Sequence, residues 1–320
     1  MRIIVTGGAG FIGSNIVAAL NARGENDILI VDHLGTGEKW KNLRGLRFAD
    51  YRDKDEFIAE VTARRAARAD AIIHMGACSA TTERDADYLM RNNYRYTRHL
   101  AEWAPETNAR LVLASSAATY GDGARGYSDA DAVTPTLRPL NMYGQSKQMF
   151  DEWALAAGHY DRIVGLKFFN VFGPGEAHKA DMRSVVHKAY HEVLATGAIS
   201  LFRSAHPDYE DGKQMRDFVY VKDAVDVVLH FLDHPATGGL YNCGTGRAQT
   251  WLDLAHAIFA AMNREPVIRW IDMPPALAGK YQYFTQADAT KLRAAGYTRA
   301  FTPLVESVAD YVGVLGAERD

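Results

Sequence analysis

Tyr143 and Lys147 are the residues whose types and spacing point most directly to chemistry. They stand four apart in the run Tyr143-Gly-Gln-Ser-Lys147, so a helix places both side chains on one face. A phenol beside an ammonium group can move a proton at neutral pH, because the cation favours the phenolate and lowers a pKa that starts at ~10. Ser116, upstream in the chain, could hold the oxygen of a reacting alcohol in line with Tyr143. These residues predict the oxidation of an alcohol.

A glycine-rich run near the start of the chain indicates what would take up the hydride. Gly7, Gly10 and Gly13 fall between a short apolar run and a helical stretch, which is the context that a dinucleotide-binding turn requires. The glycines allow the backbone to approach a pyrophosphate closely, and the charge of that group meets a helix N-terminus. Asp32 lies about 20 residues further on, where an acid binds the ribose. The run therefore predicts a bound dinucleotide.

The residues themselves leave open which dinucleotide binds. An acid at position 32 suits a free 2′-hydroxyl group, and hence NAD. Lys39 and Lys54 lie between the second and third apolar runs, where they could pair with a 2′-phosphate, and hence with NADP. Both cofactors remain possible on this reasoning.

Alternating strands and helices must position these groups. Apolar runs over 2–6, 28–32, 71–77, 110–116 and 163–169 predict five strands, and the stretch 14–23 predicts a helix with one apolar side. Strands that are apolar on both faces and alternate with helices indicate a parallel sheet covered on both sides. The fold class is therefore α/β, with a doubly wound parallel sheet of the Rossmann type.

Beyond Asn170 the regular alternation lapses. We expect a helix over 185–194, a polar loop over 206–212, and a strand-to-helix unit from Phe218 to Asp223 that returns to the sheet. At 320 residues the chain exceeds the ~250–300 at which single cores stop growing. We predict that 1–170 with about 217–240 forms the dinucleotide-binding domain. A smaller, discontinuous α/β substrate-binding domain then comprises mainly 171–216 and 241–320.

Composition bounds the class of partner. Hydrophobic content of 48%, charged content of 23% and a net charge of −3 give no indication of nucleic-acid or membrane binding. Cys78 and Cys243 have no Cys-x-x-Cys partner, so we predict free buried thiols and no metal. No apolar run reaches ~18 residues, and the first strand leaves no room for a signal peptide. The expected location is cytoplasmic.

The motifs together resemble the extended short-chain dehydrogenase/reductase superfamily, over nearly the whole chain. The resemblance implies a nucleotide-sugar epimerase, dehydratase or reductase. It is carried by these segments: Thr6–Gly13, Ser115–Gly121, Tyr143–Lys147, Phe169–Pro174, Arg216–Asp223 and Tyr241–Gly246.

A second set of segments is more selective and resembles the ADP-L-glycero-D-manno-heptose 6-epimerase family. That family inverts C6 of ADP-D-glycero-β-D-manno-heptose, a precursor of the lipopolysaccharide inner core. The resemblance implies an isomerase that prefers NADP over NAD and forms homo-oligomers, pentamers among them. The segments are His74–Ser79, Thr81–Glu83, Asn92–Tyr94, Gly175–Lys179 and Tyr281–Gln286.

This resemblance implies a two-base mechanism through a transient ketone at C6. Tyr143 would serve one face of the substrate and Lys179 the other, because the alkoxide side differs between the two epimers. Lys147 would bind the nicotinamide ribose, and Ser116 would contact the substrate. A lysine that acts at neutral pH needs a pKa well below ~10.4. We therefore expect desolvation of Lys179 or a nearby cation, with His178 as a candidate.

The remaining site residues also follow from the resemblance. Two features depart from the family pattern: Lys188 stands where we expect a family histidine, and the stretch 205–214 is longer than the simplest family pattern. The expected cofactor-binding residues are Gly7, Gly10, Phe11, Ile12, Gly13, Asp32, His33, Lys39, Lys54, Met75, Gly76, Ala77, Cys78, Ser79, Asn93, Lys147, Val171 and Lys179. The expected substrate-binding residues are Ser116, Asn170, Asp181, Lys188, Phe202, Ser204, Arg216 and Tyr281.

Two other functions remain open. A UDP-hexose 4-epimerase or dehydratase would share the fold, but a dehydratase carries an Asp-Glu pair after its catalytic serine or threonine, and Ser116-Ala-Ala has none. A 4-epimerase has no lysine base comparable with Lys179. A catalytically silent dinucleotide sensor would be expected to lack Tyr143 or Lys147, and both are present.

Overall fold

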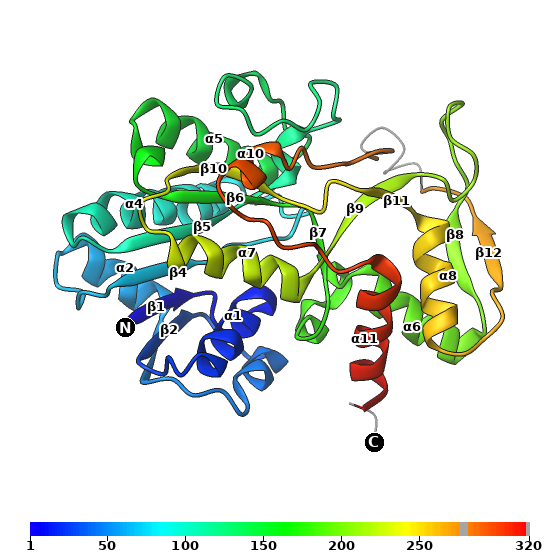
Figure 1. Cartoon of the computed structure of the whole chain (residues 1–320), viewed down its shortest axis with the longest axis horizontal. Helices are drawn as coiled ribbons and strands as arrows, with labels where there is room; N and C mark the ends of the chain where they lie inside the picture. Colours follow the sequence, from blue (N-terminus) through cyan, green and yellow to red (C-terminus); the bar gives the residue numbers. More distant parts are fainter. Residues whose placement is uncertain (275–280, 318–320) are drawn as a thin grey trace.

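A large parallel sheet forms the centre of the computed structural model, which describes residues 1–274 and 281–317 (Figure 1). Seven strands follow the order β10-β6-β5-β4-β1-β2-β3, and every neighbouring pair is parallel. The strands are β1 (Ile3–Thr6), β2 (Ile28–Asp32), β3 (Asp50–Asp53), β4 (Ala71–His74), β5 (Arg110–Ser116), β6 (Val164–Phe168) and β10 (Gly239–Cys243).

Helices cover both faces of this sheet. Successive residues of β1 point to opposite faces. Ile3 and Val5 belong to a core with α1 and α7, whereas Ile4 belongs to a core with α2, α4 and α5. The sheet is therefore doubly wound, as the sequence predicted. The helices are α1 (Phe11–Ala22), α2 (Lys54–Thr62), α3 (Ala86–Leu89), α4 (Tyr96–Glu106), α5 (Met142–Ala156) and α7 (Val221–Asp233).

The strand order reverses between β1 and β4. The chain runs outward from β1 to β2 and β3, and then outward on the other side from β4 to β5 and β6. In open α/β sheets the ligand crevice lies outside the carboxyl ends of the strands at such a switch point. Thr6 and His74 end the two strands there and are paired in the register.

A smaller part, at the right of Figure 1, carries two further sheets. In the three-stranded sheet, β9 pairs in parallel with β7 and antiparallel with β11. In the other, β12 pairs in parallel with β8. The elements are β7 (Asn170–Phe172), α6 (Val185–Thr196), β8 (Ile199–Phe202), β9 (Met215–Tyr220), β11 (Ala248–Thr250), α8 (Trp251–Ala261), β12 (Ile268–Ile271), α10 (Thr290–Ala294) and α11 (Leu304–Ala317).

Three elements differ from the sequence prediction. β9 forms the predicted strand-to-helix unit with α7 but joins β7 instead of the large sheet, and it is β10 that returns to that sheet. β3 was missed because its residues, Asp-Tyr-Arg-Asp, are polar and lie at an edge. The division into two domains stays a prediction, and residues 275–280 and 318–320 of its second part lie outside the described residues.

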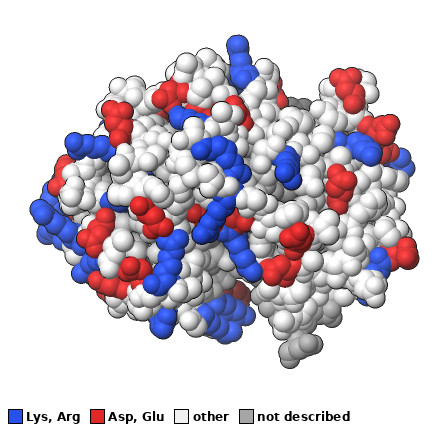
Figure 2. Space-filling view, viewed as in Figure 1, with Lys and Arg blue, Asp and Glu red and all other residues white. Residues whose placement is uncertain are grey.

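The surface charges and the two cysteines do not point to a further class of function. On the face drawn in Figure 2, acidic and basic side chains are interspersed. Within residues 1–274 and 281–317, no helix is long and apolar enough to cross a bilayer, and no His, Cys, Asp or Glu cluster could hold a metal. Cys243 is buried, whereas Cys78 is only partly buried.

Candidate active site

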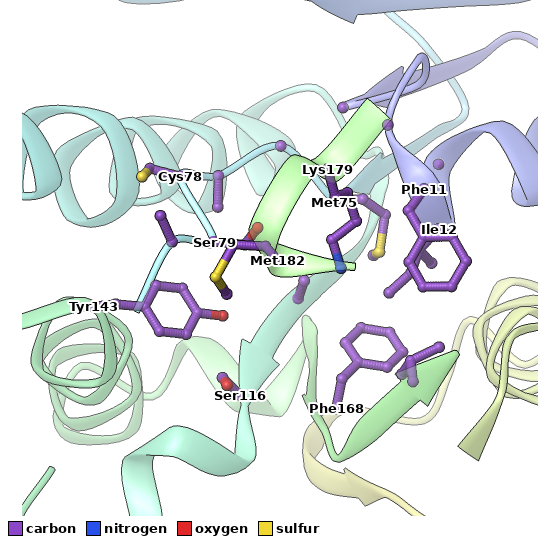
Figure 3. Close-up of a pocket in the computed structure, with 18 of the residues that line it drawn as sticks. Phe11, Ile12, Met75, Cys78, Ser79, Ser116, Tyr143, Phe168, Lys179 and Met182 are labelled. Carbon is purple, nitrogen blue, oxygen red and sulfur yellow. The ribbon is translucent and has the colours of Figure 1, made fainter. Parts of the chain in front are cut away.

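A cavity of about 470 Å³ lies at the switch point of the large sheet. It brings together the glycine-rich turn, the end of β4, Ser116, Tyr143, Lys147 and Lys179. Figure 3 shows the Tyr143 hydroxyl and the Lys179 amino group pointing into it from different sides. Of the predicted residues, those lining this cavity are Gly7, Gly10, Phe11, Ile12, Gly13, Asp32, Lys39, Met75, Gly76, Ala77, Cys78, Ser79, Ser116, Tyr143, Lys147, Val171 and Lys179.

The glycine-rich turn has room for backbone and none for side chains. A Cβ at Gly13 would lie 2.0 Å from the Gly7 carbonyl oxygen, and one at Gly7 would lie 2.7 Å from the Gly76 nitrogen. Gly7 also has a φ of +67°, which favours glycine. The turn leads into α1, whose N-cap, Gly10, makes no side-chain cap, so the first N–H groups of the helix have no side-chain acceptor there. This cradle fits the pyrophosphate of a dinucleotide.

Asp32 anchors a second, smaller cavity of about 140 Å³ beside the first. Its carboxylate accepts hydrogen bonds from the Ala9 and His33 backbone nitrogens at 2.9 and 2.7 Å. It also accepts one from the Lys39 ammonium at 2.6 Å. Lys54, the first residue of α2, lines the same cavity. The Asp32 carboxylate therefore has hydrogen-bond partners within the protein. The cavity is lined by both lysines; Lys39 pairs with Asp32, and the Lys54 ammonium donates to Asp55 at 2.7 Å.

Helix α5 and the end of β5 position the proton-transfer residues. The Asn141 side chain caps α5 by accepting from the Gly144 nitrogen at 2.8 Å, which sets Tyr143 in the first turn. The Ser116 hydroxyl oxygen accepts from the Ala118 nitrogen at 3.1 Å. Lys147 is buried and donates to the Ala114 carbonyl oxygen at 2.7 Å.

The protonation of the pair differs from the sequence prediction. Burial raises the pKa of Tyr143, and a hydrogen bond with Ser116 only partly offsets it. The prediction that Lys147 lowers this pKa is therefore wrong for the protein alone. The Lys147 ammonium is itself desolvated, which lowers its pKa to about 8, and it is directed to a carbonyl oxygen of β5. At neutral pH Tyr143 is a neutral phenol.

Lys179 lies in an environment that disfavours its ammonium form. It lies in the 3₁₀ segment η6 (Ala177–Met182), and its ammonium is 5.1 Å from the centre of the Phe11 ring. Burial is the main cause that lowers its pKa; Glu176 opposes this shift and Lys188 adds to it. The predicted lowering is confirmed. The contributing cation is Lys188 and not His178.

Asn93 lies behind the cavity and holds its wall. It sits in the π-helical turn η2 (Met90–Arg95) and is fully buried. Its side chain accepts from the Cys78 nitrogen at 2.9 Å and donates to the Cys78 carbonyl oxygen at 3.0 Å. It also donates to the Ser146 hydroxyl at 3.1 Å, and that hydroxyl donates to the Tyr143 carbonyl oxygen at 2.7 Å. Asn93 therefore ties the end of β4 to the start of α5.

His74 extends this network to the glycine-rich turn. Thr97 donates to the Asn93 carbonyl oxygen at 2.5 Å, so its oxygen accepts from His74 Nε2 at 3.0 Å. Nδ1 of His74 is then the acceptor for the Thr6 hydroxyl at 2.5 Å. Burial lowers the pKa of His74 to about 3, so the ring stays neutral. One tautomer satisfies the whole chain of hydrogen bonds.

Apart from Ser116, the predicted substrate residues do not line either of these two cavities. Arg216 is buried, with its guanidinium 5.0 Å from the Tyr281 ring centre and 5.6 Å from that of Trp251. The Phe202 ring lies edge-on to Tyr281 at 6.4 Å. Asn170 is exposed on β7, and the Ser204 nitrogen donates to Asp211 at 2.8 Å. The Asp181 carbonyl oxygen accepts from the Lys188 ammonium at 3.0 Å.

Several lining residues were missed because they are ordinary residues at strand ends and turns. Ala114 and Phe168, for example, become wall residues only because β5 and β6 end at this crevice. The missed residues of the large cavity are Ala80, Ala114, Ser115, Phe168, Phe169, His178 and Met182. Those of the small cavity are Thr6, Val31, Tyr88, Asn92 and Tyr96.

Comparisons with known proteins agree with this geometry. Residues 3–244 match the family described as the NAD dependent epimerase/dehydratase family. The chain belongs to this family. A Nitratidesulfovibrio vulgaris relative named ADP-L-glycero-D-manno-heptose-6-epimerase is 58% identical over 310 residues, which cover 97% of this chain and 96% of the relative. A Fusobacterium nucleatum relative of the same name is 46% identical and covers 99% of both chains.

Solved structures of the family share the fold. The crystal structure of ADP-L-glycero-D-manno-heptose-6-epimerase from Helicobacter pylori superposes with a TM-score of 0.83 at 26% identity, covering 98% of this chain and 96% of that one. A Bacillus cereus UDP-glucuronic acid 4-epimerase, solved with UDP-glucuronic acid and NAD, shares the fold at 22% identity and a TM-score of 0.77 over 98% and 100% of the two chains. The chain is therefore an epimerase of the nucleotide-sugar type, as the sequence resemblance indicated.

Proposed function

We propose that this epimerase inverts C6 of ADP-D-glycero-β-D-manno-heptose, giving ADP-L-glycero-β-D-manno-heptose through a transient C6 ketone. The observation that carries the proposal is the placement of Tyr143 and Lys179 on different sides of one cavity. Inversion requires a proton acceptor and a proton donor on different faces of the reacting carbon, because the hydroxyl group changes sides. The relatives named for this activity support the choice of substrate.

The environments of the two residues suit opposite roles. The raised pKa of Tyr143 keeps it a proton donor, and the lowered pKa of Lys179 favours the neutral amine, a proton acceptor. In one direction Lys179 takes the hydroxyl proton and Tyr143 returns one to the ketone on the other face. In the reverse direction the roles exchange. The bound dinucleotide supplies the chemistry that accepts and returns the hydride.

The smaller part of the chain fits the nucleotide of the substrate. Arg216 is 6% exposed, and its guanidinium donates to the Met215 carbonyl oxygen at 2.8 Å, while no carboxylate of the described residues forms an ion pair with it. A buried guanidinium without a carboxylate is stabilised when an anion binds, so a diphosphate is a fitting partner. Phe202 and Tyr281 would flank it. Contacts from Asn170, Asp181, Lys188 and Ser204 remain predictions.

For the cofactor we propose NADP, with NAD as the alternative. Lys39 and Lys54 both line the small cavity at Asp32, together with His33. Lys39 already pairs with the carboxylate, which removes much of the repulsion that Asp32 would exert on a 2′-phosphate. Mass spectrometry of the dinucleotide released by denaturation tests this choice. Recovery of NAD alone would overturn it.

The wider role is also proposed. A place in the synthesis of lipopolysaccharide inner-core precursors, a cytoplasmic location and a homo-oligomer, such as a pentamer, follow from the family resemblance. The second candidate activity is UDP-hexose 4-epimerisation, which the shared fold allows. Turnover of UDP-galactose with no conversion of the ADP-heptose would favour that alternative.

Two variants test the mechanism. We expect Tyr143→Phe and Lys179→Met each to lower kcat at least ~100-fold, the usual range for removing a general acid or base. Lys222→Met, which alters a largely exposed lysine of α7, is the matched control and should keep normal activity. Near-normal epimerisation by either active-site variant would show that the two-base assignment is wrong.

A further inference from the structure

The backbone that carries Lys179 is strained. Ala180, the next residue, has a φ of 47° and a ψ of −123°, although it is not glycine. A positive φ is unfavourable for a residue with a Cβ, and such conformations persist only where surrounding contacts impose them. The η6 segment must therefore be held from outside.

Helix α6 holds the segment at both ends. Glu176, fully buried just before η6, accepts from the Ser184 nitrogen at 2.6 Å and from the Ser184 hydroxyl at 2.5 Å. Ser184 is the N-cap of α6. From the first turns of that helix, Lys188 reaches back to the Asp181 carbonyl oxygen at 3.0 Å. Lys179 lies between these two attachments.

A third attachment joins the segment to the dinucleotide-binding turn. The Asn42 side chain donates to the Gly175 carbonyl oxygen at 2.9 Å and to the Ala9 carbonyl oxygen at 3.0 Å. It also lies 3.2 Å from Nδ1 of His178. Asn42 thereby fixes the segment that carries Lys179 relative to the turn that would hold the cofactor.

We propose that Glu176 is a positioning residue for Lys179: it fixes the strained segment to helix α6 and places a negative charge near the lysine ammonium. The inference rests on the proposed role of Lys179 as an acid/base group. Glu176 makes no contact with either cavity, since neither is lined by it. Its function is to orient the Lys179 side chain and to limit how far burial lowers the pKa of Lys179.

The charges around Lys179 support this reading. Burial lowers the pKa of Lys179 most, Glu176 raises it, and Lys188 lowers it. Burial and Lys39 lower the pKa of His178, so its ring is neutral near pH 7. Phe11 contributes only the face of its ring. Glu176 is thus the one group among these that favours the ammonium form through its charge.

The test uses Glu176→Gln, which keeps hydrogen-bonding capacity toward Ser184 and removes the charge, and Glu176→Ala, which removes both. The readout is the pH profile of kcat, measured in both directions. Where Lys179 is the base, activity rises with pH through its pKa, and in the other direction activity falls. In both directions Glu176→Gln should move this pH-dependent limb of the kcat profile, which reports the pKa of Lys179, to lower pH by about half a unit or more.

The expected results separate positioning from mere stability. Glu176→Ala should lower kcat more than tenfold with KM nearly unchanged, because the substrate does not touch Glu176. Asp253→Asn, which removes the carboxylate of the capping box of α8, is the control for loss of a helix cap and should not move the limb. A Glu176→Gln profile that superimposes on the wild type, or an unchanged kcat for Glu176→Ala, would overturn the proposal.

A second readout does not depend on activity. The pH dependence of Lys179 acylation by an amine reagent, followed by peptide mass spectrometry, reports its protonation directly. Glu176→Gln should shift this titration to lower pH, and Lys188→Gln should shift it to higher pH; no shift in either variant would refute the electrostatic part. If the wild type fails to epimerise the ADP-heptose, the proposed function is wrong. The titration of Lys179 still tests the electrostatic effect of Glu176 in that case.

Discussion

Removing the cation of the buried Lys167–Asp151 pair should destabilise the protein strongly. Both side chains are 0% exposed, and Lys167 donates to Asp151 at 2.8 Å and to Thr119 at 2.7 Å. Ser115 and Tyr160 donate to the same carboxylate at 2.6 and 2.8 Å. Asp151 lies on α5 eight residues after Tyr143, so the pair joins the catalytic helix to β5 and β6.

Lys167→Met leaves the Asp151 charge buried with only the two hydroxyl groups as partners. Breaking a buried pair in this way costs about 3–5 kcal/mol of unfolding free energy. Lys167→Met/Asp151→Asn removes the uncompensated charge and keeps a hydrogen-bonding group for Ser115 and Tyr160. The double variant should therefore be about 2 kcal/mol more stable than Lys167→Met alone.

The assay is urea unfolding of each variant at one pH and with the same saturating dinucleotide, because a ligand that binds the folded state raises the apparent stability. Equal m values would show that the variants unfold to the same extent. The predicted loss and the predicted recovery both require a costly unpaired charge. A loss of unfolding free energy below about 1 kcal/mol in Lys167→Met, or no recovery of it in the double variant, would therefore refute the argument.

Three further outcomes follow from the contacts at the site. Asn93→Ala removes the partners of the Cys78 N–H and C=O groups and of the Ser146 hydroxyl, so urea unfolding should show a loss of about 2–4 kcal/mol, and a loss below 1 kcal/mol would contradict this. Burial lowers the pKa of Lys147 from 10.5 to about 8 in the folded protein. Between these two pH values the unfolded chain binds more protons than the folded protein, so the free energy of unfolding should rise with pH there. Over that pH range the free energy of unfolding of the wild type should rise by on the order of 2–3 kcal/mol relative to that of Lys147→Met. Parallel curves of unfolding free energy against pH for the two proteins would contradict this prediction. Lys39→Ala should weaken NADP binding at least ~10-fold more than NAD binding in calorimetry of the reloaded protein, because a lysine–phosphate pair is charge-assisted, and equal losses would argue against a 2′-phosphate contact.

The large sheet was predictable because its signals are local. β2 and β5 have the predicted bounds, since each contains four consecutive apolar residues bounded by polar ones. β3 and β10 lack that signal: β3 is a polar edge strand, and β10 contains a sequence that reads as a turn motif. The pairing of β9 with β7 depends on tertiary contacts that no local pattern encodes.

The site was predictable where spacing fixes geometry. The glycine turn and the Tyr143–Lys147 pair require only a strand, a turn and a helix, and both line the cavity as expected. The Tyr143 pKa was not predictable, because desolvation depends on everything that packs around the phenol. Asn93 was assigned to the cofactor, but its hydrogen bonds place it behind the cavity wall. Glu176 belongs to the Gly175–Lys179 segment that carries the resemblance, but its contact with Ser184 was not predictable, since Ser184 is eight residues away on another element.

The most direct test of the account is to run the reaction in D₂O with ADP-D-glycero-β-D-manno-heptose and no added cofactor, and to follow C6 by NMR. The account predicts conversion to the L-glycero epimer with protium retained at C6, because the hydrogen that leaves that carbon returns to it without exchanging with solvent. Deuterium at C6 would show that a proton, and not a hydride, leaves the carbon. Absence of conversion by the protein as purified would contradict the proposed function itself.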